Sequence, residues 1–154
     1  MIKVITTLLI TLCSTVRILG QDNNEKLYKA IIKGDTTIVM QLLNSKADPN
    51  YIIVKGPWMK VNMLITAVNN GNISIVKMLI TMNADVKWKD GFKTTALMYA
   101  ASKGSKEIVA LLLNNGADVN DNDGQGNTVL SAAKESKNNE LIRFIEETIK
   151  KTIQ

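Results

Sequence analysis

Apolar residues recur along the chain in pairs of short segments with helical spacing, and each pair has a glycine at its middle and a turn-rich stretch at its end. In the clearest pair, apolar residues occupy much of 95–104 and 107–113, and residues 115–120 read Asn-Gly-Ala-Asp-Val-Asn. Glycine adopts the left-handed backbone that ends a helix without the steric cost that other residues meet. Each unit is therefore predicted to be a short helical hairpin followed by a projecting turn.

This unit repeats at a nearly constant period. Gly104 follows Gly71 by 33 residues and Thr128 follows Thr95 by 33, whereas Gly71 follows Gly34 by 37. Periods of 20–50 residues indicate repeat proteins whose units stack and share one core. Four units are expected, at about 22–57, 58–91, 92–124 and 125–154. Their shared core is predicted to include the Ile-Val pairs of the second helices together with Leu64, Leu97 and Leu130.

The repeated motifs resemble the ankyrin repeat, whose pattern reads Thr-Pro-Leu-His-x-Ala, a central Gly, Glu-Ile-Val, Leu-Leu and Gly-Ala-Asp-x-Asn. The third unit has Thr-Ala-Leu-Met-Tyr-Ala-Ala from Thr95 and Glu-Ile-Val from Glu107. The resemblance covers about residues 25–150 and implies an all-α ankyrin-repeat solenoid of helix-turn-helix units with projecting β-turn or hairpin fingers. Lysine replaces glycine at two helix ends, Lys46 and Lys137, which favours weaker ends in the terminal, capping units.

The composition argues against catalysis. The chain has no histidine and one cysteine, which removes the commonest general base, the usual partner of a Ser or Cys nucleophile, and the commonest metal ligand. The stretch 121–126, Asp-Asn-Asp-Gly-Gln-Gly, begins like a calcium loop, but Ala132 stands where a bidentate Glu is required. We interpret it as the turn between the third and fourth units. No enzyme activity, cofactor or metal is therefore expected.

The first 20 residues have the three-part pattern of a secretory signal peptide: Lys3, an apolar run at 4–13, and a more polar end. The run is too short to span a bilayer as a helix, which needs about 20 residues. Cleavage after Gly20 would leave residues 21–154 as the ankyrin-repeat domain, and cleavage after Thr15 is the alternative. A secreted or periplasmic location follows. The other interpretations are a cytoplasmic protein in which these residues form a buried helix, and a membrane anchor.

The net charge of +5 falls to +3 without the first 20 residues, because Lys3 and Arg17 are lost and 17 basic and 14 acidic residues remain. The remaining charges are scattered along the chain, so they favour solubility rather than nucleic-acid binding. The resemblance implies a noncatalytic module that binds a protein partner of unknown identity, and we expect a monomer with no stable membrane span. The alternative function is a structural or inhibitory subunit of a larger complex.

The 37-residue spacing places four extra residues in the stretch 51–60, which predicts one long finger between the first two units. Tyr51 and Trp88 lie at the same distance after their Ala-Asp turns, so their side chains are expected to be neighbours on adjacent fingers. Large aromatic side chains on surface turns are typical anchors for a partner. The predicted partner-binding patch consists of Tyr51, Trp58, Trp88 and Phe92, with a rim of Lys55, Lys60, Lys89 and Lys93.

Other roles are open to these residues. Ile52, Val54 and Trp58 could instead fold back over the exposed edge of the first unit, and the aromatic rings of 87–93 could pack on the neighbouring turn. Separately, Asn72-Ile73-Ser74 is an acceptor triplet for N-glycosylation, which requires a eukaryotic secretory pathway.

Overall fold

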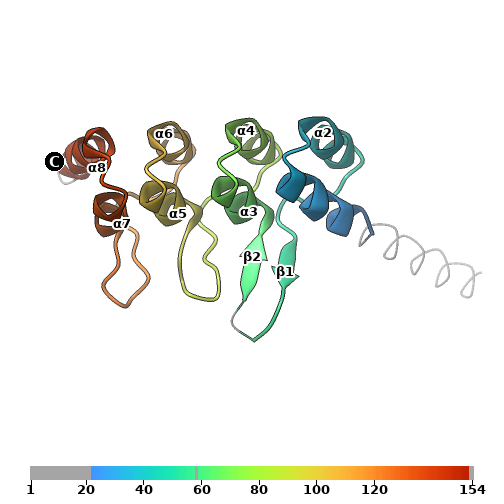
Figure 1. The fold of residues 1–154 in the computed structure, drawn as a ribbon, viewed down its shortest axis with the longest axis horizontal. Coiled ribbons are helices and arrows are strands. Elements are labelled where there is room, and N and C mark those ends of the chain that lie inside the picture. Colours follow the sequence, from blue (N-terminus) through green and yellow to red (C-terminus); the bar gives the residue numbers. More distant parts are fainter. Residues whose placement is uncertain (1–21, 58, 153–154) are drawn as a thin grey trace, which may run out of the picture.

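The computed structural model describes residues 22–57 and 59–152, and within them the helices form four pairs that stand side by side in chain order (Figure 1). Residues 22–33 are helical and belong to the first pair. The other elements are α2 (Thr36–Asn44), β1 (Ile52–Val54), β2 (Lys60–Asn62), α3 (Met63–Asn69), α4 (Ile73–Thr81), α5 (Ala96–Ser102), α6 (Lys106–Asn114), α7 (Val129–Glu135) and α8 (Asn139–Thr152). The helix-rich repeat fold predicted from the sequence is confirmed.

The helices lie in two rows. The first helices of successive pairs contact one another, α3 with α5 and α5 with α7, and the second helices do the same, α2 with α4 and α4 with α6. The connections between pairs project from the side of the first helices as fingers (Figure 1). Helices of seven to nine residues are too short to be stable alone, so stacking within the rows must stabilise them.

The predicted signal peptide, residues 1–20, lies outside the described part of the chain. Across residues 22–57 and 59–152, no helix combines the length and the apolar character that crossing a bilayer requires.

One continuous hydrophobic core runs through all four pairs. Leu64 and Leu97 are almost completely buried, as predicted, and so are the Ile-Val pairs of α4 and α6. Two residues depart from the prediction. Leu130 is only half-buried at the edge of the core, and Ile38 of the first Ile-Val pair is 45% exposed. Both lie in terminal pairs, where one side has no neighbouring pair among the described residues, and this position explains their exposure.

The first helices of the second, third and fourth pairs, α3, α5 and α7, each begin after a polar residue that caps the helix. Asn62, Thr95 and Thr128, spaced by 33 residues, accept hydrogen bonds from the backbone N–H three residues later at 2.8, 3.3 and 3.1 Å. Such caps satisfy N–H groups that have no partner in the first turn of a helix. They fix the point at which each finger turns into a helix.

The ends of the helices follow the same period. Gly34, Gly71 and Gly104 end the first helices of three pairs with φ of 71°, 68° and 71°, and Lys137 takes the same place in the fourth with φ of 58°. A non-glycine residue in this left-handed region carries strain that glycine avoids. The ends of three second helices are also left-handed, at Lys46, Asn83 and Gly116. The two lysines therefore occupy the glycine positions to which the sequence alignment assigned them.

An aspartate orders each turn that follows one of the first three second helices. The Oδ1 atoms of Asp48, Asp85 and Asp118 accept hydrogen bonds from the N–H two residues later at 2.8, 2.9 and 2.9 Å. Asn50 also joins the first turn to the second. Its Nδ2 donates to the carbonyl of Asn83 at 3.0 Å, and its Oδ1 accepts from the N–H of Asp85 at 2.7 Å.

Candidate partner-binding surface

The finger between the first two pairs is a β-hairpin. β1 and β2 pair antiparallel, Ile52 opposite Asn62, and the N–H of Lys55 donates to the carbonyl of Met59 at 2.9 Å near the tip. The next two fingers have one bridge each, Lys89 with Thr95 and Asn122 with Thr128. The bridged residues of these two fingers are six positions apart, whereas the equivalent residues of the hairpin, Ile52 and Asn62, are ten apart. The four extra residues therefore lie toward the tip of the hairpin.

The predicted aromatic patch is divided between the core and the surface. Tyr51 and Trp88 are half-buried and pack against the hydrophobic core, whereas Phe92 is 58% exposed. Trp58 lies outside the described residues. The predicted patch placed all four aromatic residues at the surface, but Tyr51 and Trp88 lie where each finger leaves the helical pairs, so their rings reach the core.

The predicted lysine rim is also divided. Lys89 forms an ion pair with Asp121 at 2.5 Å, and its Nζ donates to the carbonyl of Asn122 at 2.9 Å, so it joins two fingers. The Nζ of Lys55 lies 5.0 Å from the centroid of the Tyr28 ring, within cation–π range. Lys60 and Lys93 are exposed.

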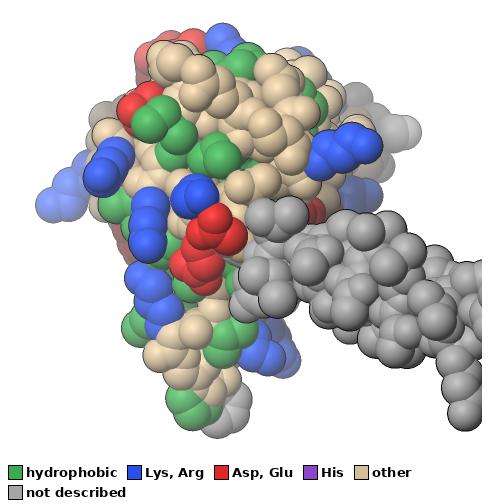
Figure 2. All heavy atoms as spheres, turned by 90° about the vertical axis from the view of Figure 1, so that its right-hand side faces the viewer, with side chains coloured by type: hydrophobic (Ala, Val, Ile, Leu, Met, Phe, Trp, Pro, Cys, Tyr) green, Lys and Arg blue, Asp and Glu red, His purple; other side chains and the backbone are tan. Residues whose placement is uncertain are grey.

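The alternative in which Ile52, Val54 and Trp58 cover the first pair is wrong for Ile52 and Val54, and Trp58 lies outside the described residues. Ile52 is 39% exposed and Val54 is 63% exposed, while Ile53 between them is 7% exposed. Side chains alternate across a strand, so the register that turns Ile53 inward turns its two neighbours outward. Seen from the end of the stack where the first pair lies, the projecting finger carries hydrophobic side chains near its tip and basic side chains on its flanks (Figure 2).

Two aspartates, Asp90 and Asp123, hold the second and third fingers in shape. The Oδ1 of Asp90 accepts from the N–H of Phe92 and Thr94 at 2.8 and 2.9 Å. The Oδ1 of Asp123 accepts from Gln125 and Asn127 in the same way, at 2.8 and 3.1 Å. Both aspartates are nearly buried. Their 33-residue spacing is the signal in the sequence that marks them as equivalent positions of the repeat.

The stretch 121–126 acts as a turn, as interpreted from the sequence. The Asp121 carboxylate pairs with Lys89, and the Asp123 carboxylate accepts hydrogen bonds from its own loop. Among the described residues, no group of three or more His, Cys, Asp and Glu side chains is arranged to hold a metal ion.

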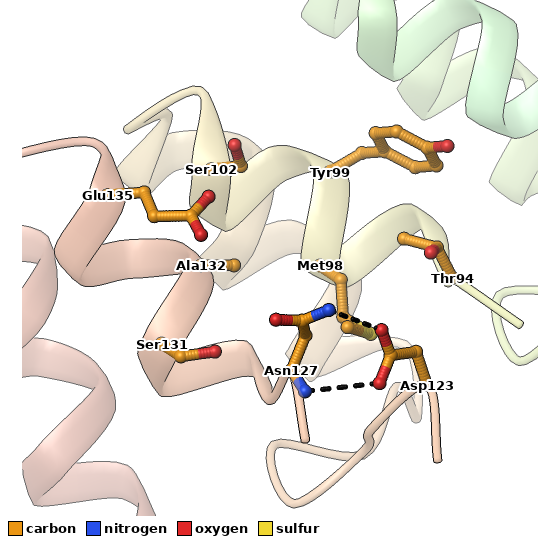
Figure 3. Close-up of a pocket in the computed structure, with 9 residues that line it drawn as sticks. All are labelled: Thr94, Met98, Tyr99, Ser102, Asp123, Asn127, Ser131, Ala132 and Glu135. Atoms are coloured by element: carbon orange, nitrogen blue, oxygen red, sulfur yellow. Dashed lines mark hydrogen bonds between the residues drawn. The ribbon is translucent and has the colours of Figure 1, made fainter. Parts of the chain in front are cut away.

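A cavity of about 190 Å³ lies between α5, α7 and the third finger, which includes residues 122–128 (Figure 3). Met98 and Ala132 contribute apolar surface to it, and both are buried. Polar groups surround this apolar patch, and they include side chains of two acidic residues. The polar lining residues are Thr94, Tyr99, Ser102, Asp123, Asn127, Ser131 and Glu135.

The electrostatics of the cavity are set partly by its aspartate. Hydrogen bonds from the side chain of Asn127 and from the backbone of Gln125 hold the pKa of Asp123 below its ordinary value. At neutral pH this carboxylate is therefore anionic.

Tyr99 is held by a different aspartate. Its hydroxyl donates to Oδ2 of Asp90 at 2.7 Å, and its ring points away from Asp123 and Asn127 (Figure 3). Burial of the phenol, followed by the hydrogen bond to Asp90 and the charge of Asp90, raises the pKa of Tyr99 well above its ordinary value of 10.0.

This raised pKa predicts a loss of stability in alkali. The folded chain keeps the Tyr99 proton more tightly than the unfolded chain, so the contribution is complete below pH 10.0 and declines as the pH rises further. Urea unfolding at about pH 9 and about pH 11 measures this loss. Tyr99→Phe should lose less stability between the two pH values than the unmodified chain, and an equal loss in both would contradict the assignment.

The fold and the surface together define a stacked helical-repeat protein with an exposed set of fingers and a cavity beside the last of them. The family model for ankyrin repeats matches residues 64–154 in three copies, and the chain belongs to this family. No curated protein compared with the chain matches it. Ankyrin repeats are generally protein-interaction modules and are typically noncatalytic, which agrees with the binding role and the lack of catalysis expected from the sequence.

Proposed function

We propose that this protein is a noncatalytic binding module that contacts a protein partner through its fingers and the cavity beside the third finger. The observation that carries the proposal is the exposure of large apolar side chains on the fingers. These side chains are Ile52, Val54, Met59 and Phe92, and they are 39–63% exposed. An apolar side chain held in water gains free energy when a partner buries it, and such residues are typical binding anchors.

The proposal reassigns the roles within the aromatic patch. Phe92 is the anchor, Lys60 and Lys93 are its basic rim, and Tyr51 and Trp88 support the fingers from below. Lys55 and Lys89 position the fingers through Tyr28 and Asp121. Trp58 is also proposed as an anchor, and its position in the sequence of the long finger is the only support for this role.

A comparison of Phe92→Ala with Trp88→Ala tests these roles. We expect Phe92→Ala to weaken partner binding at least about tenfold with an unchanged melting temperature, because an exposed anchor contributes mainly to the complex. Trp88→Ala should instead lower the melting temperature by several degrees, because its ring packs against the core. The partner is obtained by pull-down from the native compartment, and affinity and melting are measured on each variant.

Ile38→Ala is the matched control, since Ile38 is an exposed apolar residue on α2, away from the fingers. It should leave both binding and melting unchanged. Unchanged partner binding by Phe92→Ala would refute the proposed anchor, and a chain that retains no protein from its own compartment would refute the binding function.

We further propose that residues 22–57 are a fourth ankyrin repeat, so that the domain is a four-repeat solenoid. The supporting observations are the left-handed residues Gly34 and Lys46 at the expected helix ends. The Asp48 turn also has the geometry of the turns at Asp85 and Asp118. The left-handed residues and the aspartate turns lie at equivalent places in these units, which favours their being copies of one repeat.

The domain is proposed to act as a monomer. The second pair buries Met63 and Thr66, but the corresponding positions of the first pair, 37 residues earlier, are the exposed residues Lys26 and Lys29. At the opposite end, Lys134 replaces the buried Ala101 of the preceding pair. Stacking of two copies end to end would bury lysines against one another, which opposes self-association.

The sequence of the first 20 residues is the basis for proposing that the chain is exported. We propose that residues 1–20 are a signal peptide and that the mature chain is secreted or periplasmic. Cleavage after Gly20 removes none of the helical residues described, which begin at residue 22. Amino-terminal sequencing of the protein recovered from outside the cytoplasm should begin at Gln21. An intact amino terminus on a protein confined to the cytoplasm would exclude export.

A further inference from the structure

We infer that the cavity between α5, α7 and the third finger takes a basic side chain, lysine or arginine, from the protein partner. This inference rests on the proposed binding function and adds the chemistry of one contact. It goes beyond the exposed apolar anchors of the fingers because the residues involved, Asp123, Ala132 and Glu135, line the cavity.

The second and third fingers differ beside the cavity. Oδ2 of Asp90, in the second finger, accepts the hydroxyl proton of Tyr99 of α5 at 2.7 Å. The equivalents 33 residues later are Asp123, in the third finger, and Ala132 of α7. Oδ2 of Asp123 accepts only from Nδ2 of Asn127 among the described residues, at 2.5 Å. The third finger therefore keeps the acceptor, but α7 lacks the tyrosine that α5 supplies to the second finger.

The cavity lies beside this missing tyrosine. Ala132 lines it on one side and the loop of Asp123 on the other, as Figure 3 shows. A carboxylate oxygen has more than one acceptor site, so Oδ2 of Asp123 can receive a second hydrogen bond. A donor that enters the cavity would take the place that the phenol of Tyr99 has in the third unit.

The cavity is lined by a second acidic residue besides Asp123. The carboxylate of Glu135 points toward the cavity in Figure 3 and makes no hydrogen bond or ion pair with the described residues. None of the lining residues is basic. A cationic donor would therefore meet two carboxylates, and charge-assisted hydrogen bonds are stronger than neutral ones.

The apolar surface of the cavity suits the rest of such a side chain. Met98 and Ala132 are 3% and 8% exposed and lie between the polar groups. Lysine and arginine have a long aliphatic stem that packs on apolar surface while the charged end contacts acceptors. A neutral side chain would lack the charge that pairs with the two carboxylates, and an acidic side chain would be repelled by them.

The first finger and the first pair have different residues at these positions. Asp123 and Asn127 correspond to Ile53 and Val61 in the first finger, and Ser102 corresponds to Ile32, which is 49% exposed. The surface beside the first helices thus changes from more apolar near the first pair to acidic near the last pair. A partner segment would lie with its apolar residues toward the first pair and its basic residue in the cavity.

The test is a titration of the complete chain with two probes, N-acetyl-arginine amide and N-acetyl-lysine amide, followed by NMR. We expect saturable shifts of the Asn127 side-chain amide and the Ser131 backbone amide, with dissociation constants in the millimolar range. N-acetyl-glutamine amide is the neutral control probe. No saturable shift up to about 100 mM of either basic probe, or equal binding of the neutral probe, would overturn the inference.

Two variants locate the binding. Ala132→Tyr restores the tyrosine of the third unit and should abolish the shifts while the chain keeps its melting temperature. Glu135→Gln should weaken binding at least about threefold, whereas Glu107→Gln, which changes a carboxylate on α6 outside the cavity, should not. Binding by folded Ala132→Tyr equal to that of the unmodified chain would refute the site. Because the probes need no partner, these results stand apart from the pull-down that tests the proposed function.

Discussion

Leu97→Ala is expected to lower the free energy of unfolding by about 2–5 kcal/mol, the range for removing most of a leucine side chain from a packed core. Leu97 is 1% exposed in α5, a helix that contacts α3, α6 and α7. A cavity there loosens the contacts of three helices at once. Because the core is continuous, the loss should appear as one transition at lower urea concentration, measured by circular dichroism.

Val54→Ala is the control for Leu97→Ala. It also truncates an aliphatic side chain, but Val54 is 63% exposed on the long finger, so its effect should stay within about 0.5 kcal/mol. A loss for Leu97→Ala as small as that of the control would remove Leu97 from the core. It would also undermine the alignment of the repeat units on which the core prediction was based.

Asp90→Ala should cost about 2–4 kcal/mol, although the residue lies in a finger and not in a helix. Its carboxylate accepts from the N–H of Phe92 and Thr94 and from the hydroxyl of Tyr99, and it is 7% exposed. Removing it leaves these donors without their acceptor, and a buried donor without a partner is more costly than a lost hydrogen bond in water. Urea unfolding provides the measurement.

Asp85→Ala is the matched control, because Asp85 is exposed and its side chain accepts a single hydrogen bond, from Lys87. Its cost should not exceed about 1 kcal/mol. Asp90→Asn should recover much of the stability, since the amide oxygen still accepts from the two backbone N–H groups. Equal costs for Asp90→Ala and Asp85→Ala would mean that the finger is not held by the Asp90 carboxylate.

Much of the fold could be predicted from the period of the sequence. The glycines at 34, 71 and 104 and the lysine at 137 mark the same helix end, and all have positive φ. The aspartate turns could be predicted for the same reason, because each aspartate accepts a hydrogen bond from the backbone two residues later and needs no distant partner. Local features of this kind are encoded within a few residues and therefore repeat visibly.

The candidate site was harder to predict because it depends on contacts between units. Tyr51 and Trp88 are aromatic residues in predicted turns, and nothing local distinguishes them from the exposed Phe92. Likewise, the inward direction of Ile53 follows from the register of β1 and β2, which a shift of one residue would reverse. Sequence reasoning recognised the long finger but could not assign the side chains to its two faces.

The sequence by itself determined the repeat, the number of helical pairs, the helix ends and the position of the long finger, because short amphipathic helices joined by turns can bury their apolar faces only by stacking. Tertiary structure alone decided which finger residues face the core and that a cavity forms beside Asp123. That cavity depends on Ala132 in α7 standing opposite the turn and on Met98 of the preceding unit. Such a space is created by packing between units, and no local pattern of residues encodes it.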